Sequence, residues 1–321
     1  MRHPSSQSGT PMDWTQRIGR RLKPRDLHVF MAVAEGGSMA KAADRLAISR
    51  PVVSRTIAEL EHILGVRLLD RTVQGVELTR YGETLFRRGL AVFEELRQSV
   101  KEIEFLADPN AGELRVGVTE VPAGGIVPAA LDRLSRSYPR MTVYTEQGSA
   151  TTVLGHLRER RCELIVVRLL TNEPDVEIEP LVYEQLTIVA SKRSRWAARR
   201  KVGLPDLIDE AWIQSRQEVA PGGPTYEAFK AFGLDVPKCM ILSDSLNLRY
   251  GLLATGRFIT MIPGSALHYG PERASITKLP ITLPRWRLPT SIVTLKGRTL
   301  TPLASLFCEE LRFLAKPLVR N

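Results

Sequence analysis

The segment "SRPVVSR", Ser49 to Arg55, holds the side chains of this sequence best suited to binding another molecule. The guanidinium groups of Arg50 and Arg55 can each donate two parallel hydrogen bonds to guanine O6 and N7. The Ser54 hydroxyl can bond a base edge or a phosphate, and small residues let the backbone come close. This combination predicts contact with the major groove of double-stranded DNA.

A helix must present these residues, and the spacing predicts one from Ser49 to Gly65. Ser49 is a suitable N-cap, and Pro51 falls in the first turn, where a missing N–H costs little. Apolar residues recur at helical spacing and form the buried stripe. That stripe consists of Val53, Ile57, Leu60 and Leu64. Pro51, Ser54 and Arg55 then lie on the opposite side, next to a helix N-terminus whose dipole favours phosphate.

The preceding and following residues predict the rest of a winged helix-turn-helix. Leu27, Phe30, Met31 and Ala34 share one helix face, and "EGG" ends that helix. Ser38 can cap a second helix, which a short turn connects to the helix at Ser49. Residues 66–79 indicate two short strands with a turn at Gln74-Gly75. They form a wing whose Arg67 and Arg71 can reach the DNA backbone.

A long helical pattern without an internal proline covers residues 81–107, and "DPNAG" then ends it. Its apolar residues recur every three or four positions, as in a coiled-coil seam, and Gly89 is the weak point of that seam. Such a stripe could instead pack on its own domain. We expect the helix to pair with a second copy of the chain. The expected dimerisation residues are Phe86, Phe93, Leu96, Val100 and Ile103.

Beyond Gly112 the chain alternates strand and helix patterns to its end, which predicts an α/β domain with a largely parallel sheet. A second series of strands and helices begins at "YEQLTIVA", so two lobes fit better than one continuous sheet. Ligands of such folds bind beyond the carboxyl ends of the strands.

Composition limits the possible functions. The formal net charge is +10, which makes polyanions plausible partners. No apolar run approaches the roughly 20 residues that cross a bilayer, and the first 22 residues lack the apolar core of a secretory signal. Cys162, Cys239 and Cys308 lie far apart, as do the five histidines. We therefore expect a cytoplasmic protein without a membrane partner, structural metal or cofactor.

The stretch "LHVFMAVAEGGSMAKAADRLAISRPVVSRTIAELEHILGVRLLDRTVQGVELTRYGE" closely resembles the winged helix-turn-helix of LysR-type transcriptional regulators. The resemblance runs from Leu27 to about Leu85 without an apparent gap. Three positions depart from the family pattern: Arg50 stands where Gln is commonest, Met39 where Phe is usual, and Tyr81 where Ala is usual. The positions that match DNA-contacting residues of the family are Ser38, Ala40, Arg50, Pro51, Ser54 and Arg55.

The rest of the chain, to about Leu318, resembles the effector domain of the same family, which has two lobes like periplasmic binding proteins. The resemblance implies a small-molecule effector between the lobes. Thr119 matches a common ligand contact, and Gly148, Ser149 and Thr151 match a second contact loop. Ala150 stands where the family often has Ser, so Ser149 or Thr151 would supply that hydroxyl. Further candidates in the loops at strand ends are Glu120, Ser215, Gln217, Asp244 and Ser245.

The identity of the effector stays open, because Glu120 favours an amine or a polyol whereas family effectors are often acids. The resemblance further implies a dimer, expected to assemble into a tetramer, that binds a pseudo-palindromic operator and contacts RNA polymerase. Whether it activates or represses is not contained in the sequence.

These patterns divide the chain into four parts. Residues 1–22 are expected to be a mostly disordered extension, 23–82 the DNA-binding domain and 83–107 the linker helix. Residues 112–318 form the effector domain, with one lobe of about 112–183 plus 264–318 and another of about 184–263.

Other classes of protein fit less well. An enzyme would need a site, and "VGVTEVPAGG" is not a glycine-rich phosphate loop, while no serine elbow or metal-spaced histidine pair is present. A redox sensor would need reactive cysteines, but Cys162 and Cys239 adjoin strands, positions typical of buried packing residues. A nucleoid-type protein would bind DNA without sequence preference and would not require the large second domain.

Overall fold

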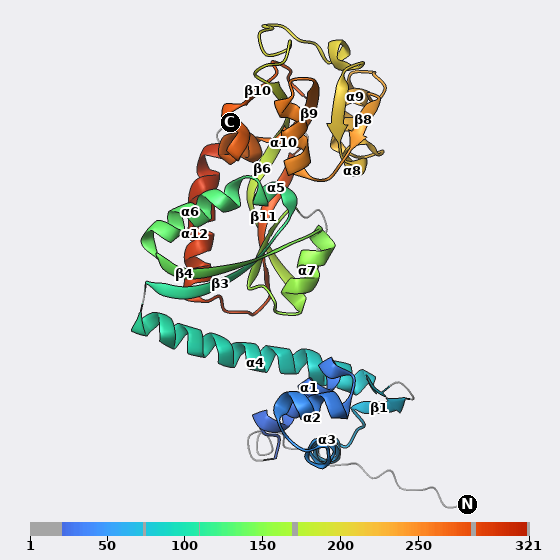
Figure 1. Ribbon diagram of the computed structural model, residues 1–321, viewed down its shortest axis with the longest axis vertical. Helices are drawn as coiled ribbons and strands as arrows, with labels where there is room; N and C mark the ends of the chain where they lie inside the picture. The colour runs from blue at the N-terminus through green and yellow to red at the C-terminus, as the bar shows by residue number, and fades with distance from the viewer. Residues whose placement is uncertain (1–20, 73–74, 109, 169–172, 284–286, 320–321) are drawn as a thin grey trace, which may run out of the picture. The chain divides into compact units, whose positions relative to one another are not determined.

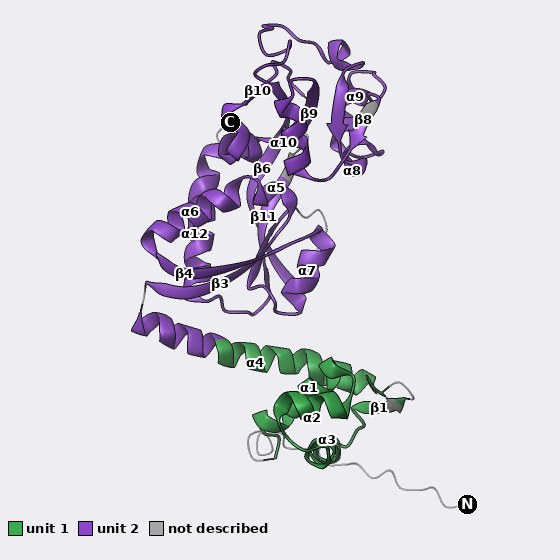
Figure 2. Ribbon diagram, in the orientation of Figure 1, with its two compact units in different colours: residues 1–97 green, residues 98–321 purple. Residues whose placement is uncertain are grey.

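The computed structural model describes residues 21–72, 75–108, 110–168, 173–283 and 287–319. The expected N-terminal extension therefore lies almost wholly outside the described residues. The chain forms two compact units, residues 1–97 and 98–321, which Figure 2 shows in different colours. Each unit is described by itself.

The first unit is a small helical domain with a two-stranded wing (Figure 1). Its elements are α1 Pro24–Gly36, α2 Met39–Leu46, α3 Arg50–Leu64, β1 Leu69–Thr72 and β2 Gly75–Leu78. Leu27, Phe30 and Val33 of α1 are buried together with Val53, Ile57 and Leu60 of α3. These are the apolar stripes that the spacing predicted, and their burial is what orients α3 in its domain.

Helix α4, Arg80–Ala107, begins in the first unit and continues into the second. Its first turns pack on the helical domain. A Cβ on Gly89 would lie 2.8 Å from Met31 Sδ, so this glycine permits close packing against α1. Phe86 and Phe93 also pack against the helical core, and the Phe93 ring lies 5.6 Å from that of His28. This part of the expected seam, including Gly89, therefore faces its own domain.

The second unit is built on a sheet of nine strands in the order β4-β3-β5-β11-β6-β9-β7-β8, with β10 beside β6. The strands are β3 Ala111–Val118, β4 Arg140–Gln147, β5 Leu164–Val167, β6 Val176–Ser191, β7 Ala211–Gln214, β8 Cys239–Leu242, β9 Phe258–Pro263, β10 Ile276–Lys278 and β11 Arg287–Leu295. β6 pairs with β11 over its first part and with β9 over its last part, so this one strand belongs to both lobes.

In the first lobe, helices cover both faces of the sheet (Figure 1). Helices α6 Ile126–Ser137 and α12 Pro302–Val319 pack with β3 and β5 around Val116, Val166 and Phe307. Helix α7 Ala150–Arg158 covers the other face, where Ile165 and Val293 are buried. The strands are apolar on both faces for this reason.

In the second lobe, α9 Pro224–Ala231 packs on one face of the sheet through Phe229 and Trp212, whose rings meet edge to face. Helices α10 Leu246–Ala254 and α11 Gly264–Tyr269 cover Val189 and Ile262. Short helices α5 Glu120–Ala123 and α8 Arg216–Val219 follow strands β3 and β7.

Two expectations differ from the structure. The sheet is mixed, because β6 runs antiparallel to β9, β10 and β11, whereas a largely parallel sheet was predicted. The sequence also placed residues 264–318 in the first lobe. β10 instead pairs with β6 in the second lobe, and Leu279 and Leu283 join its core. The apolar residues after Pro263 complete that core before the chain returns through β11.

Candidate DNA-binding and effector-binding sites

The leading end of α3 presents a cationic surface. Arg50, Pro51 and Arg55 are exposed and Ser54 is half-buried, while Val53 and Ile57 on the other side are buried. Among the described residues, neither arginine forms an ion pair; Arg45 of α2, by contrast, pairs with Glu35 at 2.6 Å. Both guanidinium groups are thus available for a partner outside the chain.

The N-terminus of α3 is also available. Ser49 occupies the N-cap position as predicted, but its side chain makes no capping hydrogen bond. Ser38 does cap α2, where its hydroxyl accepts the Ala40 N–H at 3.2 Å. Ser38 is therefore engaged within the domain, and Ala40 is half-buried beside it. An N-terminus without a side-chain cap, next to Arg50, favours an anion such as a DNA phosphate.

The turn that sets the position of α3 after α2 depends on one left-handed residue. Ala47 has φ 51°, and the Ile48 N–H donates to the Ala43 carbonyl at 3.1 Å. A residue other than glycine in this conformation is strained, by an amount on the order of 1–2 kcal/mol. The tight turn places the start of α3 directly after the end of α2.

The wing is tied to the helices through its backbone. The Val76 N–H donates to the Gly37 carbonyl at 3.0 Å, and a Cβ on Gly75 would lie only 2.3 Å from that carbonyl oxygen. Arg67 is exposed ahead of β1, and its carbonyl accepts the Thr79 hydroxyl at 2.7 Å. The Arg71 side chain and the predicted turn residue Gln74 lie outside the described residues.

The second half of α4 exposes an apolar stripe. Leu96, Val100 and Ile103 are 51%, 55% and 66% exposed, and Val92 and Leu106 extend the stripe at both ends. We call these five residues the α4 stripe. An apolar row of this length on a charged helix is typical of a helix that pairs with another. Of the predicted seam, Leu96, Val100 and Ile103 belong to it, whereas Phe86 and Phe93 do not.

The predicted effector contacts lie after the carboxyl ends of parallel strands. Thr119 and Glu120 follow β3, and Gly148, Ser149 and Thr151 follow β4. In the second lobe, Ser215 and Gln217 follow β7, while Asp244 and Ser245 follow β8. Three of the serine hydroxyls are N-caps: Ser149 accepts from Thr152 N–H, Ser215 from Glu218 N–H and Ser245 from Leu248 N–H. These oxygens already stabilise helix ends, although each hydroxyl can still donate.

Glu120 connects the lobes. Its carboxylate accepts the Leu246 N–H, at the N-terminus of α10, at 2.8 Å. The other carboxylate oxygen accepts the side-chain amide of Gln147, at the end of β4. The strand ends of the two lobes therefore face each other, and a negative charge of the chain already occupies the α10 N-terminus.

Sequence reasoning missed a set of buried charged groups near these strand ends. Glu184, on β6, accepts the Ser265 N–H at 2.8 Å and the Thr290 hydroxyl at 2.6 Å. Arg249 of α10 forms a fork-like pair with Glu218 at 3.1 and 2.7 Å. Arg168 follows β5, and burial lowers the pKa of its guanidinium, an effect opposed by the nearby Glu184 and Glu218 carboxylates. The available signal was a charge at the end of the apolar run "LIVV".

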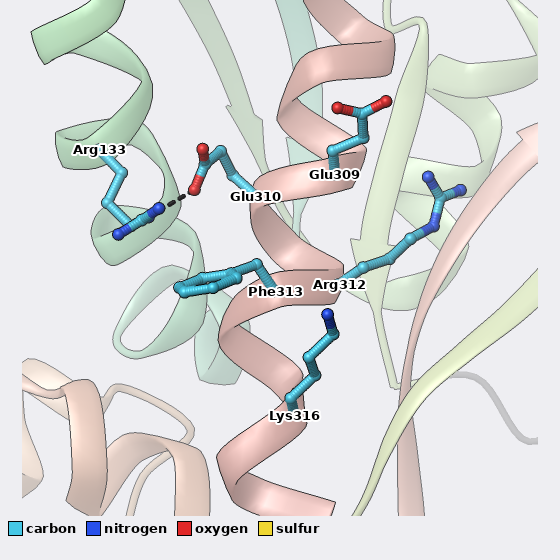
Figure 3. Close-up of a pocket in the computed structure, with 6 residues that line it drawn as sticks. All are labelled: Arg133, Glu309, Glu310, Arg312, Phe313 and Lys316. Carbon is cyan, nitrogen blue, oxygen red and sulfur yellow. Dashed lines mark hydrogen bonds and ion pairs between the residues drawn. The ribbon is translucent and has the colours of Figure 1, made fainter.

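A separate surface pocket lies between α6 and α12 and is lined by charged side chains around Phe313 (Figure 3). Arg133 lies over the Phe313 ring, 4.4 Å from its centroid, and pairs with Glu310. Arg312 pairs with Glu179 at 2.7 Å. These charges neutralise one another, and none of the predicted effector contacts lies here.

Two further searches of the described part of the chain bear on function. No helix there is long and apolar enough to cross a bilayer, and no group of His, Cys, Asp and Glu side chains there could hold a metal ion. Burial raises the pKa of the Cys162 thiol to about 11 and that of Cys308 to about 12. The Cys239 side chain lies outside the described residues.

Comparison with known proteins finds two family models on this chain. Residues 24–83 match the model described as "Bacterial regulatory helix-turn-helix protein, lysR family", and residues 107–315 match the "LysR substrate binding domain". Together the two matched ranges include α3 and every predicted effector contact.

Individual relatives are similar over most of their length. The chain is 26% identical over 296 residues to the uncharacterized HTH-type transcriptional regulator YybE of Bacillus subtilis, covering 92% of this chain and 97% of the relative. It is 31% identical over 292 residues to the SDS degradation transcriptional activation protein of a Pseudomonas species, covering 87% and 92%. Among solved structures, full-length CbnR complexed with its target DNA is 25% identical with a TM-score of 0.52, covering 92% of this chain and all of that one.

Proposed function

The chain belongs to the LysR family of bacterial helix-turn-helix regulators, and on this basis we propose that α3 reads an operator while a small molecule in the second unit adjusts the regulatory output. The observation that carries the proposal is the α3 surface. Arg50 and Arg55 are exposed cations without an internal partner among the described residues, beside a helix N-terminus without a side-chain cap.

In this proposal the domain binds the major groove through α3. Arg50, Ser54 and Arg55 contact base edges, and Ser38, Ala40, Ser49 and Pro51 line the approach to the backbone. Arg67 and Arg71 of the wing neutralise phosphates, which supply much of the affinity and make it depend on salt. The CbnR structure contains target DNA, which supports the choice of double-stranded DNA as partner.

Assembly follows from the α4 stripe. One recognition helix reads a few base pairs, whereas two helices about one DNA turn apart read a pseudo-palindrome. Pairing of α4 with its counterpart buries the stripe and gives a dimer, and the effector domains extend it to a tetramer. RNA polymerase is the further partner of such a regulator, and the cytoplasm its compartment. Turnover of a substrate is not part of this function.

The effector acts through the second unit. Its proposed contacts are the loops after β3, β4, β7 and β8, where Glu120 already joins the two lobes. A ligand there can alter DNA binding only by its unequal affinity for two arrangements of the oligomer. The residues from Thr119 to Ser245 at these strand ends are thus the candidates for its recognition.

The test is selection of DNA by the purified full-length protein from sheared genomic fragments, followed by footprinting. We expect protection of a pseudo-palindromic site, with affinity that falls steeply as salt rises. Equal affinity for all fragments would contradict the proposed sequence-specific function.

A further inference from the structure

Arg168 occupies a position where a ligand could reach it. Val167, the last residue of β5, pairs with Ser291 of β11, and the Thr119 N–H at the end of β3 donates to the Val166 carbonyl at 3.2 Å. Arg168 therefore stands at the carboxyl edge of the first lobe, next to the predicted contact Thr119. The Glu218 carboxylate of the second lobe lies near enough to act on its charge.

The guanidinium of Arg168 has one buried edge without a partner. Its Nε and Nη2 atoms are shielded from solvent and, among the described residues, accept no hydrogen-bond partner of their N–H groups. These two atoms carry the parallel N–H bonds of one guanidinium edge, the arrangement that binds two oxygens of a carboxylate at once. Unpaired buried donors are rare in folded proteins, which marks this edge as a binding group.

The acidic groups near Arg168 already have donors of their own. Glu184 accepts from Ser265 and Thr290, and Glu218 accepts from Arg249. The N-terminus of α10, another favourable position for an anion, is occupied by Glu120. Among the described residues of this region, the Arg168 edge is thus the anion-binding group that the chain leaves open.

We propose that the Nε–Nη2 edge of Arg168 binds the carboxylate of a small organic acid, which is the effector of this protein. The inference rests on the proposed function of the second unit as an effector domain, and it names the chemical class of that effector. Two carboxylates, Glu184 and Glu218, act on Arg168, so a singly charged head group is favoured over a doubly charged phosphate. Two coplanar oxygens also match the planar edge.

The experiment uses the full-length protein and simple acids as probes. Sodium phenylacetate and sodium hexanoate are each compared with the corresponding primary amide by calorimetry and by ¹⁵N NMR of the Arg168 Nε–H. We expect at least one acid, but not its amide, to bind saturably and shift this signal. Arg168→Gln should weaken binding of that acid about 10- to 100-fold, and Arg168→Lys, which keeps the charge but not the fork, should weaken it less.

Matched controls separate the possible outcomes. Arg136→Gln removes an exposed arginine of the same lobe and should leave acid binding unchanged. An Nε–H signal that no acid shifts, equal binding of acid and amide, or stronger binding of inorganic phosphate or sulfate would overturn the proposal. If Arg168→Gln fails to fold, the wild-type NMR comparison still decides. Operator binding is measured in parallel, so its survival alongside a negative result would remove the acid site and leave the regulator intact.

Discussion

At the scale of single residues, function depends on groups whose hydrogen-bonding capacity is left unused. Arg50 and Arg55 on α3 and the buried edge of Arg168 share this property within the described residues, although one pair is exposed and the other group is buried. A charged group without an internal partner contributes little to stability and is free to bind. The residue-scale predictions follow from this difference.

Replacing Arg50 or Arg55 by Ala should weaken operator binding by about 1–3 kcal/mol if the residue contacts a base pair through two hydrogen bonds. The measurement is fluorescence anisotropy with operator and with random DNA. Arg45→Ala, which removes an arginine already paired with Glu35, serves as the control and should have a smaller effect. Equal losses on both DNAs would restrict the tested arginine to the phosphate backbone.

Gly75→Ala should destabilise the DNA-binding domain because its Cβ would lie 2.3 Å from the Gly37 carbonyl oxygen. Gly65→Ala is the matched control: Gly65 also has a positive φ, of 71°, but a Cβ there meets no atom within 4 Å. We expect the unfolding free energy of Gly75→Ala to fall by about 1–3 kcal/mol more than that of the control. Equal losses in chemical denaturation would mean that the wing moves away without cost.

At the scale of elements, helices serve two partners at once. Helix α4 packs on α1 through Phe86, Gly89 and Phe93 and then exposes the α4 stripe. Helix α10 has its own N-cap, Ser245, and also receives Glu120 from the other lobe. Each shared element can therefore transmit a change in one region to another, and each can be tested separately.

Leu96→Glu or Ile103→Glu should prevent dimerisation, since each places a charge within the exposed apolar stripe of α4. The mass in solution, measured by multi-angle light scattering, should fall to that of a smaller assembly. Glu104→Lys, an exposed change outside the stripe, is the control. A mass that is the same in all variants would show that assembly does not use this stripe.

Glu120→Ala should loosen the connection between the lobes, because it removes the carboxylate that accepts the Leu246 N–H. A charged acceptor at a helix N-terminus contributes about 0.3–2 kcal/mol, so we expect faster hydrogen exchange of the Leu246 amide. Asp244→Ala, at an exposed position close by, should leave this exchange rate unchanged. Unaltered exchange in Glu120→Ala would mean that the contact does not hold the lobes.

At the scale of the whole molecule, the fold buries reactive groups in its cores. Cys162 and Cys308 lie in the two cores on opposite faces of the first-lobe sheet. Burial raises the pKa of both thiols, to about 11 and about 12, so they stay protonated at neutral pH. A protonated, buried thiol is a poor nucleophile, which disfavours redox sensing by these two residues.

Peroxide treatment at neutral pH should therefore leave operator binding unchanged, as measured by gel shift, and iodoacetamide should label neither thiol of the folded protein. The thiols also stabilise the fold in a defined pH window. Their contribution is complete below the unfolded pKa of 9.0 and is lost as pH rises towards about 11, since the unfolded state ionises first. Loss of operator binding after oxidation, reversed by a reductant, would contradict this prediction.

The sequence alone determined the elements whose information is local. The apolar spacing of α3, the cap at Ser38 and the strand–helix alternation after Gly112 all depend on neighbours within a few residues, and each was predictable. The exposed face of α3 followed directly, because burying one stripe of a helix leaves the opposite side free.

Only the tertiary structure decided what depends on residues far apart in the chain. It turned Phe86 and Phe93 towards their own domain, moved the return of the chain into the first lobe beyond β10, and made the sheet mixed. It also placed Glu120 on the N-terminus of α10 and buried the edge of Arg168 without a partner. Long-range contacts between segments more than 100 residues apart produce these features, and no periodicity within one segment encodes them.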